Sequence, residues 1–364
     1  MEMLPIWTVL VLCLLANLPG DQAITAGTDD GAERWGYAQV RPKANLFWWW
    51  YKSPQRLSSP ANPWPTVLWL QGGPGASSVG QGNFNEVGPL DVNLNPRNTT
   101  WLQMADVIFV DSPVGVGYSY VEDPSALAKT DAQAAMDVTE LIKALVKEIP
   151  TLQSSPLHIV GESYGGKLAA MIGVSVARSI RAGTLNLTLG GVVLGDGWVS
   201  PIDLALSYPL FLHTMSRLDD SAVGRAITIG IKMKQQIAAQ QFLAAYRTLN
   251  DLMQFIDGRS GQVVDELLMY GVNVTVYNGQ LDVICPTIGA ESWLKKLKWD
   301  GLQKFLSLPR ENLGYCHPLY DTFMRSHKNL RFYWVLGAGH KVPMDQPCTA
   351  VYMIGDIVNS PGRK

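Results

Sequence analysis

The sequence carries few charged residues and no excess of either sign. Only 16% of its 364 residues are charged, and the formal net charge is -2 at pH 7. Such a chain has no general basic field of the kind that attracts nucleic acid or an anionic membrane surface. It also lacks internal repeats and low-complexity linkers, whereas its 47% of hydrophobic residues suffices for a large core. We therefore expect a folded globular protein with no nucleic-acid partner.

Histidine and cysteine are scarce as well. The five histidines do not occur at a metal-ligand spacing such as H-E-x-x-H, so the sequence predicts no metal and no other cofactor. The four cysteines are Cys13, Cys285, Cys316 and Cys348. Cys13 lies in an N-terminal segment that, as argued next, is expected to be removed from the protein.

A long apolar run occurs only at the N-terminus. Leu4 to Leu18 is almost unbroken and about 15 residues long, shorter than the roughly 20 that a membrane-spanning helix needs. Small residues follow at Gly20 and Ala23. This pattern predicts a cleaved signal peptide over residues 1–23 and a mature chain over 24–364 that is secreted or lysosomal. No later segment is long and apolar enough to span a bilayer, so we expect no membrane span.

The secretory pathway has two further consequences for the chain. Sequons of the type N-x-[ST] stand at Asn98, Asn186 and Asn273, and we expect glycosylation there. Loss of Cys13 with the signal leaves three cysteines, so in an oxidising compartment at least one thiol is free or has lost its partner. The sequence alone leaves the pairing of these three open.

Strand-like and helix-like segments alternate along the chain. Two early strands, 33–41 and 45–52, are expected to form a hairpin, and buried strands are expected at 66–71, 105–111, 157–160, 189–198, 274–282 and 330–340. Helices are expected over 128–148, 165–180, most of 203–256 and about 345–358. These repeated units predict an α/β fold with a mostly parallel sheet and helices on both faces. Ligands of such folds lie at the carboxyl ends of the strands.

The segment Gly161–Gly165, "GESYG", follows one of these strands and opens a helix. Strand, G-x-S-x-G and helix in that order are typical of a nucleophile elbow, where the glycines permit a strained turn. The helix N-terminus would favour negative charge that develops next to Ser163. We predict Ser163 as a nucleophile, and the alternative is a serine that only caps the helix.

A serine nucleophile needs a histidine base and an acid that orients the base. Hydrolases of this type carry them in the order serine, acid, histidine. Asp282 ends the strand "VTVYNGQLD", and His340 follows the strand in "WVLGAGHKVP". We predict these two as the partners of Ser163, with Asp196 and Asp203 as rival acids.

An oxyanion hole requires two backbone amides near the nucleophile. The amide of Tyr164, directly after the nucleophile, would be the first. The glycine-rich loop "QGGPG" at 71–75 follows a predicted strand and would supply the second, from Gly73.

Five blocks of the sequence occur in the order found in a known family. They are "WLQGGPGASS", "FVDSPVGVGYSY", "GESYGGK", "YNGQLD" and "GAGHKVP". In these blocks, over most of its mature length, the chain resembles the serine carboxypeptidases. The resemblance implies an α/β-hydrolase fold and an acyl-enzyme mechanism with an acidic optimum. The implied substrates are peptides or proteins with a free C-terminus, and a homodimer is left open.

The resemblance also indicates residues that would bind the terminal carboxylate of the substrate. They are Trp69, Gln71, Glu86 and Glu162. Two carboxyl groups in one pocket share a proton, because two adjacent negative charges repel each other. A protonated glutamate can donate a hydrogen bond to the terminal carboxylate, so we expect recognition of a free C-terminus to be favoured in acid.

The chain departs from the family pattern in several places. Lys341 follows His340 where methionine is usual, which places a cation beside the pocket of the leaving group. Only 119 residues separate Ser163 from Asp282, far fewer than in the family generally, so we predict a partly deleted helical cap over about 203–262. Two alternatives stay open: an esterase or acyltransferase with the same triad, and a catalytically silent, cap-deleted form.

Overall fold

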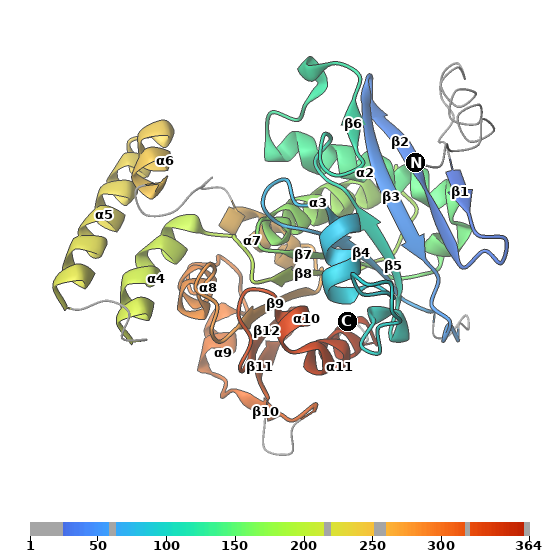
Figure 1. The fold of residues 1–364 in the computed structure, drawn as a ribbon. Coiled ribbons are helices and arrows are strands. Elements are labelled where there is room, and N and C mark those ends of the chain that lie inside the picture. Colours follow the sequence, from blue (N-terminus) through green and yellow to red (C-terminus); the bar gives the residue numbers. More distant parts are fainter. Residues whose placement is uncertain (1–24, 58–62, 215–219, 251–259, 317–320, 360–364) are drawn as a thin grey trace, which may run out of the picture.

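The computed structural model describes residues 25–57, 63–214, 220–250, 260–316 and 321–359 (Figure 1). The predicted signal peptide, residues 1–23, lies outside these ranges. The strands form one 12-stranded sheet. They are β1 (Thr25–Gly27), β2 (Glu33–Arg41), β3 (Ala44–Tyr51), β4 (Thr66–Leu70), β5 (Asp106–Val110), β6 (Tyr120–Val121), β7 (Leu157–Glu162), β8 (Leu189–Gly195), β9 (Val274–Gly279), β10 (Glu311–Leu313), β11 (Thr322–His327) and β12 (Leu330–Val335).

Six neighbouring strands in the middle of the sheet run parallel, in the order β5-β4-β7-β8-β9-β12. Antiparallel strands extend the sheet on both sides. The hairpin of β2 and β3 lies next to β5, and β11 and β10 lie beyond β12. The predicted α/β fold with a mostly parallel sheet is therefore confirmed, and so is the early hairpin.

Helices cover both faces of this sheet (Figure 1). They are α2 (Asp131–Glu148), α3 (Tyr164–Arg181), α4 (Pro201–Thr214), α5 (Asp220–Ala238), α6 (Phe242–Asn250), α7 (Ser260–Met269), α8 (Thr287–Leu294), α9 (Leu302–Ser307), α10 (Val342–Asp345) and α11 (Pro347–Asn359), together with a π-helical segment, η2 (Ser78–Val87). Buried side chains of α2, α3, α7, α8 and α9 form one hydrophobic core with the sheet. Those of η2 and α11 form a second core.

The central strands alternate their side chains between these two cores. In β4, Leu68 and Leu70 join the core of α2 and α3, whereas Val67 and Trp69 join the core of α11. Successive residues of a strand point to opposite faces, so a strand covered on both sides reads as a continuous apolar run. This is why "TVLWL" could be predicted as a buried strand.

Helices α4, α5 and α6 lie beside the sheet and not across either face of it (Figure 1). Helix α4 packs against α8 and α5, and α5 packs against α6. A small separate cluster holds them, with Leu204 and Tyr208 of α4, Met233 of α5 and Ala245 of α6 around Trp198. These helices occupy most of the predicted cap region, whose residues 215–219 and 251–259 lie outside the described ranges.

Several elements differ from the sequence prediction. The strand β11 was not expected, because "TFMRSH" is only half-buried and carries Arg325 in its middle. The segment η2 has no apolar period that would mark it as a helix. Strands β9 and β12 also end earlier than predicted, at Gly279 and Val335, so Asp282 and His340 stand in loops and not directly at strand ends.

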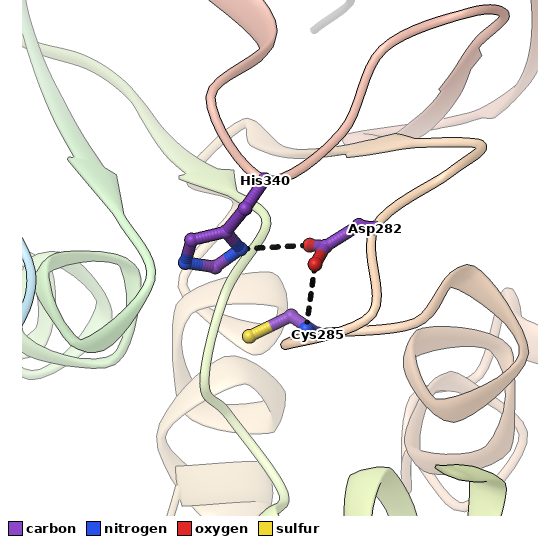
Figure 2. A group of neighbouring side chains, drawn as sticks. All are labelled: Asp282, Cys285 and His340. Atoms are coloured by element: carbon purple, nitrogen blue, oxygen red, sulfur yellow. Dashed lines mark hydrogen bonds and ion pairs between the residues drawn. The ribbon is translucent and has the colours of Figure 1, made fainter. Parts of the chain in front are cut away.

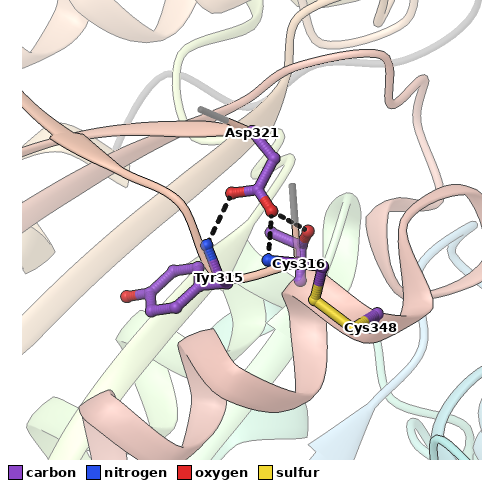
Figure 3. The surroundings of a disulfide bond; sticks show 5 residues. Tyr315, Cys316, Asp321 and Cys348 are labelled. Atoms are coloured by element: carbon purple, nitrogen blue, oxygen red, sulfur yellow. Dashed lines mark hydrogen bonds between the residues drawn. A yellow bond between two sulfur atoms is a disulfide. The ribbon is translucent and has the colours of Figure 1, made fainter. Parts of the chain in front are cut away.

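A disulfide bond joins Cys316 to Cys348 across a sequence separation of 32 (Figure 3). It ties the segment after β10 to the start of α11. Asp321 stiffens the same corner, because its carboxylate accepts hydrogen bonds from the amide of Cys316 (2.8 Å) and the hydroxyl of Thr349 (3.0 Å). Cys285, the other cysteine of the described residues, is a free thiol and buried.

Within the described ranges, none of the helices is long and apolar enough to cross a membrane.

Candidate active site

Ser163 occupies the sharp turn between β7 and α3. Its backbone has φ 58° and ψ -123°, a conformation that side chains other than glycine seldom adopt. The turn is held from both sides, because the amide of Ser163 donates to the carbonyl of Gly195 (2.8 Å) and its carbonyl accepts from Trp198 (2.8 Å). A Cβ at Gly161 would lie 2.0 Å from the carbonyl oxygen of Gly165, so the glycine is required there. This is the backbone arrangement that the sequence predicted for "GESYG".

Asp282 and His340 meet at the carboxyl end of the parallel strands (Figure 2). The Nδ1 atom of His340 lies 2.8 Å from Oδ2 of Asp282. The other oxygen of this buried carboxylate accepts the amides of Ile284 (2.7 Å) and Cys285 (2.9 Å). Backbone donors therefore fix the carboxylate, and the carboxylate orients the imidazole with its second nitrogen away from Asp282.

The thiol of Cys285 lies next to this pair and interacts with Ser163, the predicted nucleophile. Ligand atoms of Asp282, Cys285 and His340 all lie within 4.8 Å of one another. Burial raises the pKa of the Cys285 thiol well above its usual value, and a hydrogen bond with the side chain of Ser163 opposes that shift. The structure thus joins Asp282 to His340 and places Cys285 beside them and beside Ser163, whereas the action of Ser163, Asp282 and His340 as a triad stays a prediction. The structure also adds Cys285, which sequence reasoning had noted only because three cysteines cannot all pair with one another.

The odd number of cysteines does not require a lost partner, because Cys316 pairs with Cys348 and Cys285 is a free, buried thiol.

The two rival acids lie in different surroundings. Asp203 pairs with Lys296 and accepts a hydrogen bond from Ser200, so it belongs to the start of α4. Asp196 is fully buried, and its Oδ1 accepts the amide of Gly279 (2.7 Å). Burial and the neighbouring charge of Asp282 raise the pKa of Asp196 well above its usual value, which favours a neutral carboxyl group. Only Asp282 holds His340.

The predicted oxyanion segments both flank Ser163. Tyr164 begins α3, and the loop after β4 lies so close that a Cβ at Gly72 would be 2.7 Å from Cβ and 3.2 Å from Oγ of Ser163. Gly73 has φ 113°, a conformation open to glycine. The close approach of Gly72 to Ser163 could not be predicted from the sequence, apart from the presence of adjacent glycines.

The four residues expected at the terminal carboxylate form one buried cluster. The Nε2 atom of Gln71 donates to Glu86 (3.2 Å) and to Glu162 (3.0 Å), and its Oε1 accepts the indole N–H of Trp69 (2.9 Å). Burial, followed by the charge of Glu86, raises the pKa of Glu162 well above its usual value. Lys341 joins the cluster through its Nζ, which lies 3.2 Å from Oε1 of Glu86.

A cavity of about 410 Å³ opens on the other side of Tyr164. Its walls include Pro74, Pro113 and Trp198, and Lys167 lies in it with its ammonium 2.6 Å from Asp131. No sequence pattern predicts this cavity, because its walls come from five separate segments, all of them loops or helix starts. The cavity lies beside the elbow, because Tyr164 directly follows Ser163.

The three sequons differ in accessibility. Asn98 and Asn186 are exposed, whereas Asn273 is half-buried and its Nδ2 donates to the carbonyl of Gly190 (3.2 Å). Glycosylation of all three stays a prediction.

Comparison with known proteins agrees with this architecture. The sequence profile of the family described as serine carboxypeptidase matches residues 23–257 and 229–360. The chain belongs to the serine carboxypeptidase family. It is 40% identical to serine carboxypeptidase-like 51 of Arabidopsis thaliana, covering 97% of this chain and 98% of that protein. It is 36% identical to the retinoid-inducible serine carboxypeptidase of Homo sapiens, covering 96% of each. Membership makes this chain a serine-type carboxypeptidase, a class of hydrolase.

A solved structure shows the same fold. Kex1(delta)p, a prohormone-processing carboxypeptidase from Saccharomyces cerevisiae, superposes with a TM-score of 0.75 over 90% of each chain, at 18% identity. The predicted α/β-hydrolase fold is thereby confirmed.

The alignment with the Arabidopsis relative also bears on the cap. It runs over 453 positions, whereas 97% of this chain is about 353 residues, which leaves about 100 positions without a residue of this chain. The two profile matches overlap at residues 229–257, inside the predicted cap region.

Proposed function

We propose that this carboxypeptidase removes single residues from the C-terminus of peptides by way of an acyl-enzyme on Ser163. The observation that carries the proposal is the buried cluster of Glu86, Gln71 and Glu162, which lies directly beside the nucleophile elbow. A plain esterase has no need of two buried carboxyl groups at that place. A terminal carboxylate bound there would bring the last peptide bond next to Ser163.

In the proposed mechanism each group acts through its position. His340 takes the proton of Ser163 as the hydroxyl attacks the last peptide carbonyl, and Asp282 holds the imidazole and stabilises its charged form. The amides of Tyr164 and Gly73 would bind the oxyanion. The C-terminal amino acid then leaves with the proton from His340, and a water molecule attacks the acyl-enzyme by the same route in reverse.

The acidic preference follows from the raised pKa of Glu162. While Glu162 is protonated it can donate a hydrogen bond to the terminal carboxylate of the peptide. Once it ionises beside Glu86, the two glutamates repel that carboxylate. Substrate affinity is therefore expected to fall as the pH rises, which suits a protein of the lysosome or another acidic compartment of the secretory pathway.

The shortened cap is part of the proposal. Helices α4, α5 and α6 would be the remainder of a larger cap, and the gaps in the alignment with the Arabidopsis relative support this reading. A reduced cap excludes less water and offers fewer side-chain pockets. Because of the reduced cap, the experiment below must also distinguish two alternatives: an esterase or acyltransferase with the same triad, and a catalytically silent form. A homodimer stays a prediction.

The test compares the mature chain with a Ser163→Ala variant. We expect a fluorophosphonate probe to label the mature chain and not the variant, and we expect free amino acid to appear from an N-blocked peptide at pH 5. Absence of labelling in a folded protein would favour the silent form. Labelling with ester cleavage, but without release of an amino acid, would favour the esterase.

A further inference from the structure

Lys341 connects the predicted base to the buried glutamates. It follows His340 in the chain, immediately before α10. Its Nζ lies 3.2 Å from Oε1 of Glu86, whose side chain is fully buried, while the lysine side chain is 30% exposed. One end of the residue is therefore held inside the cluster, and part of its side chain stays exposed.

The donors around the two glutamates are unequal. Oε1 of Glu86 accepts from both Gln71 and Lys341, and Oε1 of Glu162 accepts from Gln71. The ammonium of Lys341 contacts Glu86 and not Glu162, and burial raises the pKa of Glu162, so Glu162 is favoured in its neutral form. The Oε2 atoms of Glu86 and Glu162 are both buried, and within the described residues neither has a partner unless the two carboxyl groups share a proton. A hydrogen bond with Glu86 is among the causes that raise the pKa of Glu162, so the proton of Glu162 is the one available to a substrate carboxylate.

The groups that face this corner differ in charge. The ammonium of Lys341 lies against Glu86, and burial favours the neutral form of Glu162. Asp196, at the end of β8, also faces the cluster and is favoured in its neutral form. Tyr277 of β9, whose phenol burial keeps protonated, the buried thiol of Cys285 and the guanidinium of Arg97 also interact with these glutamates. A peptide carboxylate bound in this corner would therefore meet a cation at Lys341 and neutral groups at Glu162, Asp196 and Tyr277.

We propose that Lys341 is a specificity-determining residue whose ammonium pairs with the terminal carboxylate of the peptide while Glu162 donates a hydrogen bond to it. This inference rests on the proposed carboxypeptidase function. An ammonium has three N–H donors, and the contact with Glu86 uses one. Methionine at this position could make neither contact.

The lysine has two opposing effects on substrate binding: it increases the affinity for the peptide, and it narrows the pH range over which Glu162 stays protonated. Its charge attracts the peptide carboxylate at any pH at which the lysine is protonated. The same charge lowers the pKa of Glu162, against the larger effect of burial. A variant without the cation should consequently bind peptides more weakly in acid, yet lose its remaining affinity only at a higher pH. A lysine with a purely structural role would give neither result.

The experiment measures inhibition by pairs of non-cleavable peptides that differ only in ending as a free acid or as a carboxamide. Ester cleavage by the same preparations reports Ser163 without a terminal carboxylate. We expect the preference for acid over amide to fall about tenfold in Lys341→Met and Lys341→Gln, and to stay within about threefold of the unmodified protein in Lys341→Arg. Lys328→Met serves as a matched control, because Lys328 is exposed and its ion-pair partner is Asp300, which is not part of the glutamate cluster.

Two results would overturn the inference about Lys341, and a third, distinguishable from them, would overturn the proposed function on which it rests. An unchanged preference in folded Lys341→Met shows that the lysine only partners Glu86. A loss confined to peptides that end in Asp or Glu shows that it reads the last side chain and not the carboxylate. If the unmodified protein cleaves esters but has no preference for acids, the proposed function itself fails.

Discussion

Glu162 is a carboxyl group that the fold keeps from water directly beside the nucleophile. Its neighbours in the chain, the strand β7 and Ser163, are both fixed by backbone hydrogen bonds, so the group cannot move into solvent to ionise. Removing a charge from water is costly unless it is paired, which is why burial is the largest cause of its raised pKa. In the proposed function the residue acts as a hydrogen-bond donor, a role unusual for glutamate.

Glu162→Gln tests this role at the residue scale. Glutamine donates a hydrogen bond at every pH, so KM for peptides should stop rising between about pH 5 and pH 8, while it rises in the unmodified protein. The measurement is KM against pH for one N-blocked peptide. A variant with an unchanged pH profile would refute the assignment.

The two buried aspartates near His340 should respond differently to loss of their charge. Asp282→Asn removes the acceptor that orients the imidazole and should lower kcat by roughly 10⁴-fold. Asp196→Asn preserves the acceptor for Gly279 and replaces a carboxyl group that is favoured in its neutral form, so kcat should fall by less than about tenfold. Cleavage of a simple ester measures both. Equal losses would mean that Asp196 also acts as an anion.

At the scale of elements, buried strands could be predicted from the sequence and the polar segments could not. "TVLWL" and "LHIV" are apolar because each is covered on both faces. The segment η2 carries Glu86 on a π-helical turn of glycines and polar residues, and no period in its sequence marks that shape. Glu86 was therefore found by resemblance to a family and not by pattern.

The catalytic loops show the same division. The order of Ser163, Asp282 and His340 was readable, because each follows a parallel strand and those strands end at one edge. The role of Cys285 was not readable, since a lone buried thiol has no spacing that distinguishes it. The cavity next to Tyr164 was equally hidden, because its walls come together only in the folded chain.

The disulfide supports the edge of the sheet near α11. Replacing both Cys316 and Cys348 by serine frees a loop of 32 residues. By loop-closure entropy this should cost about 3–4 kcal/mol of unfolding free energy. Urea unfolding of the double variant against the oxidised protein measures the loss. Equal midpoints would show that the hydrogen bonds of Asp321 suffice to hold the corner.

For the whole molecule, buried carboxyl groups make stability depend on pH. The folded-state pKa values of Glu162 and Asp196 lie above their unfolded values, so the folded state retains protons that the unfolded chain releases. Stability from these groups is present below their usual pKa values and is lost as the pH rises through the raised ones. Each proton contributes a slope of up to about 1.4 kcal/mol per pH unit in that window.

We therefore expect the melting temperature to fall between about pH 5 and pH 8, and to fall less in a Glu162→Gln, Asp196→Asn double variant. Thermal melts across this pH range measure both. A matched surface variant, Asp300→Asn, should keep the full slope, because its carboxyl group is exposed and pairs only with Lys328. A flat profile in the unmodified protein would contradict the assignment of protons to these carboxyl groups.

The sheet order has a consequence for the time at which activity can arise. Strand β12 lies between β9 and β11, and His340 follows it, 177 positions after Ser163. At a synthesis rate of about 5–20 residues per second, the base emerges roughly 10–35 s after the nucleophile. Until then the elbow has neither its imidazole nor the strand that closes the site. If His340 is the base as proposed, a nascent chain gains its activity only after this last strand of the parallel set has been synthesised.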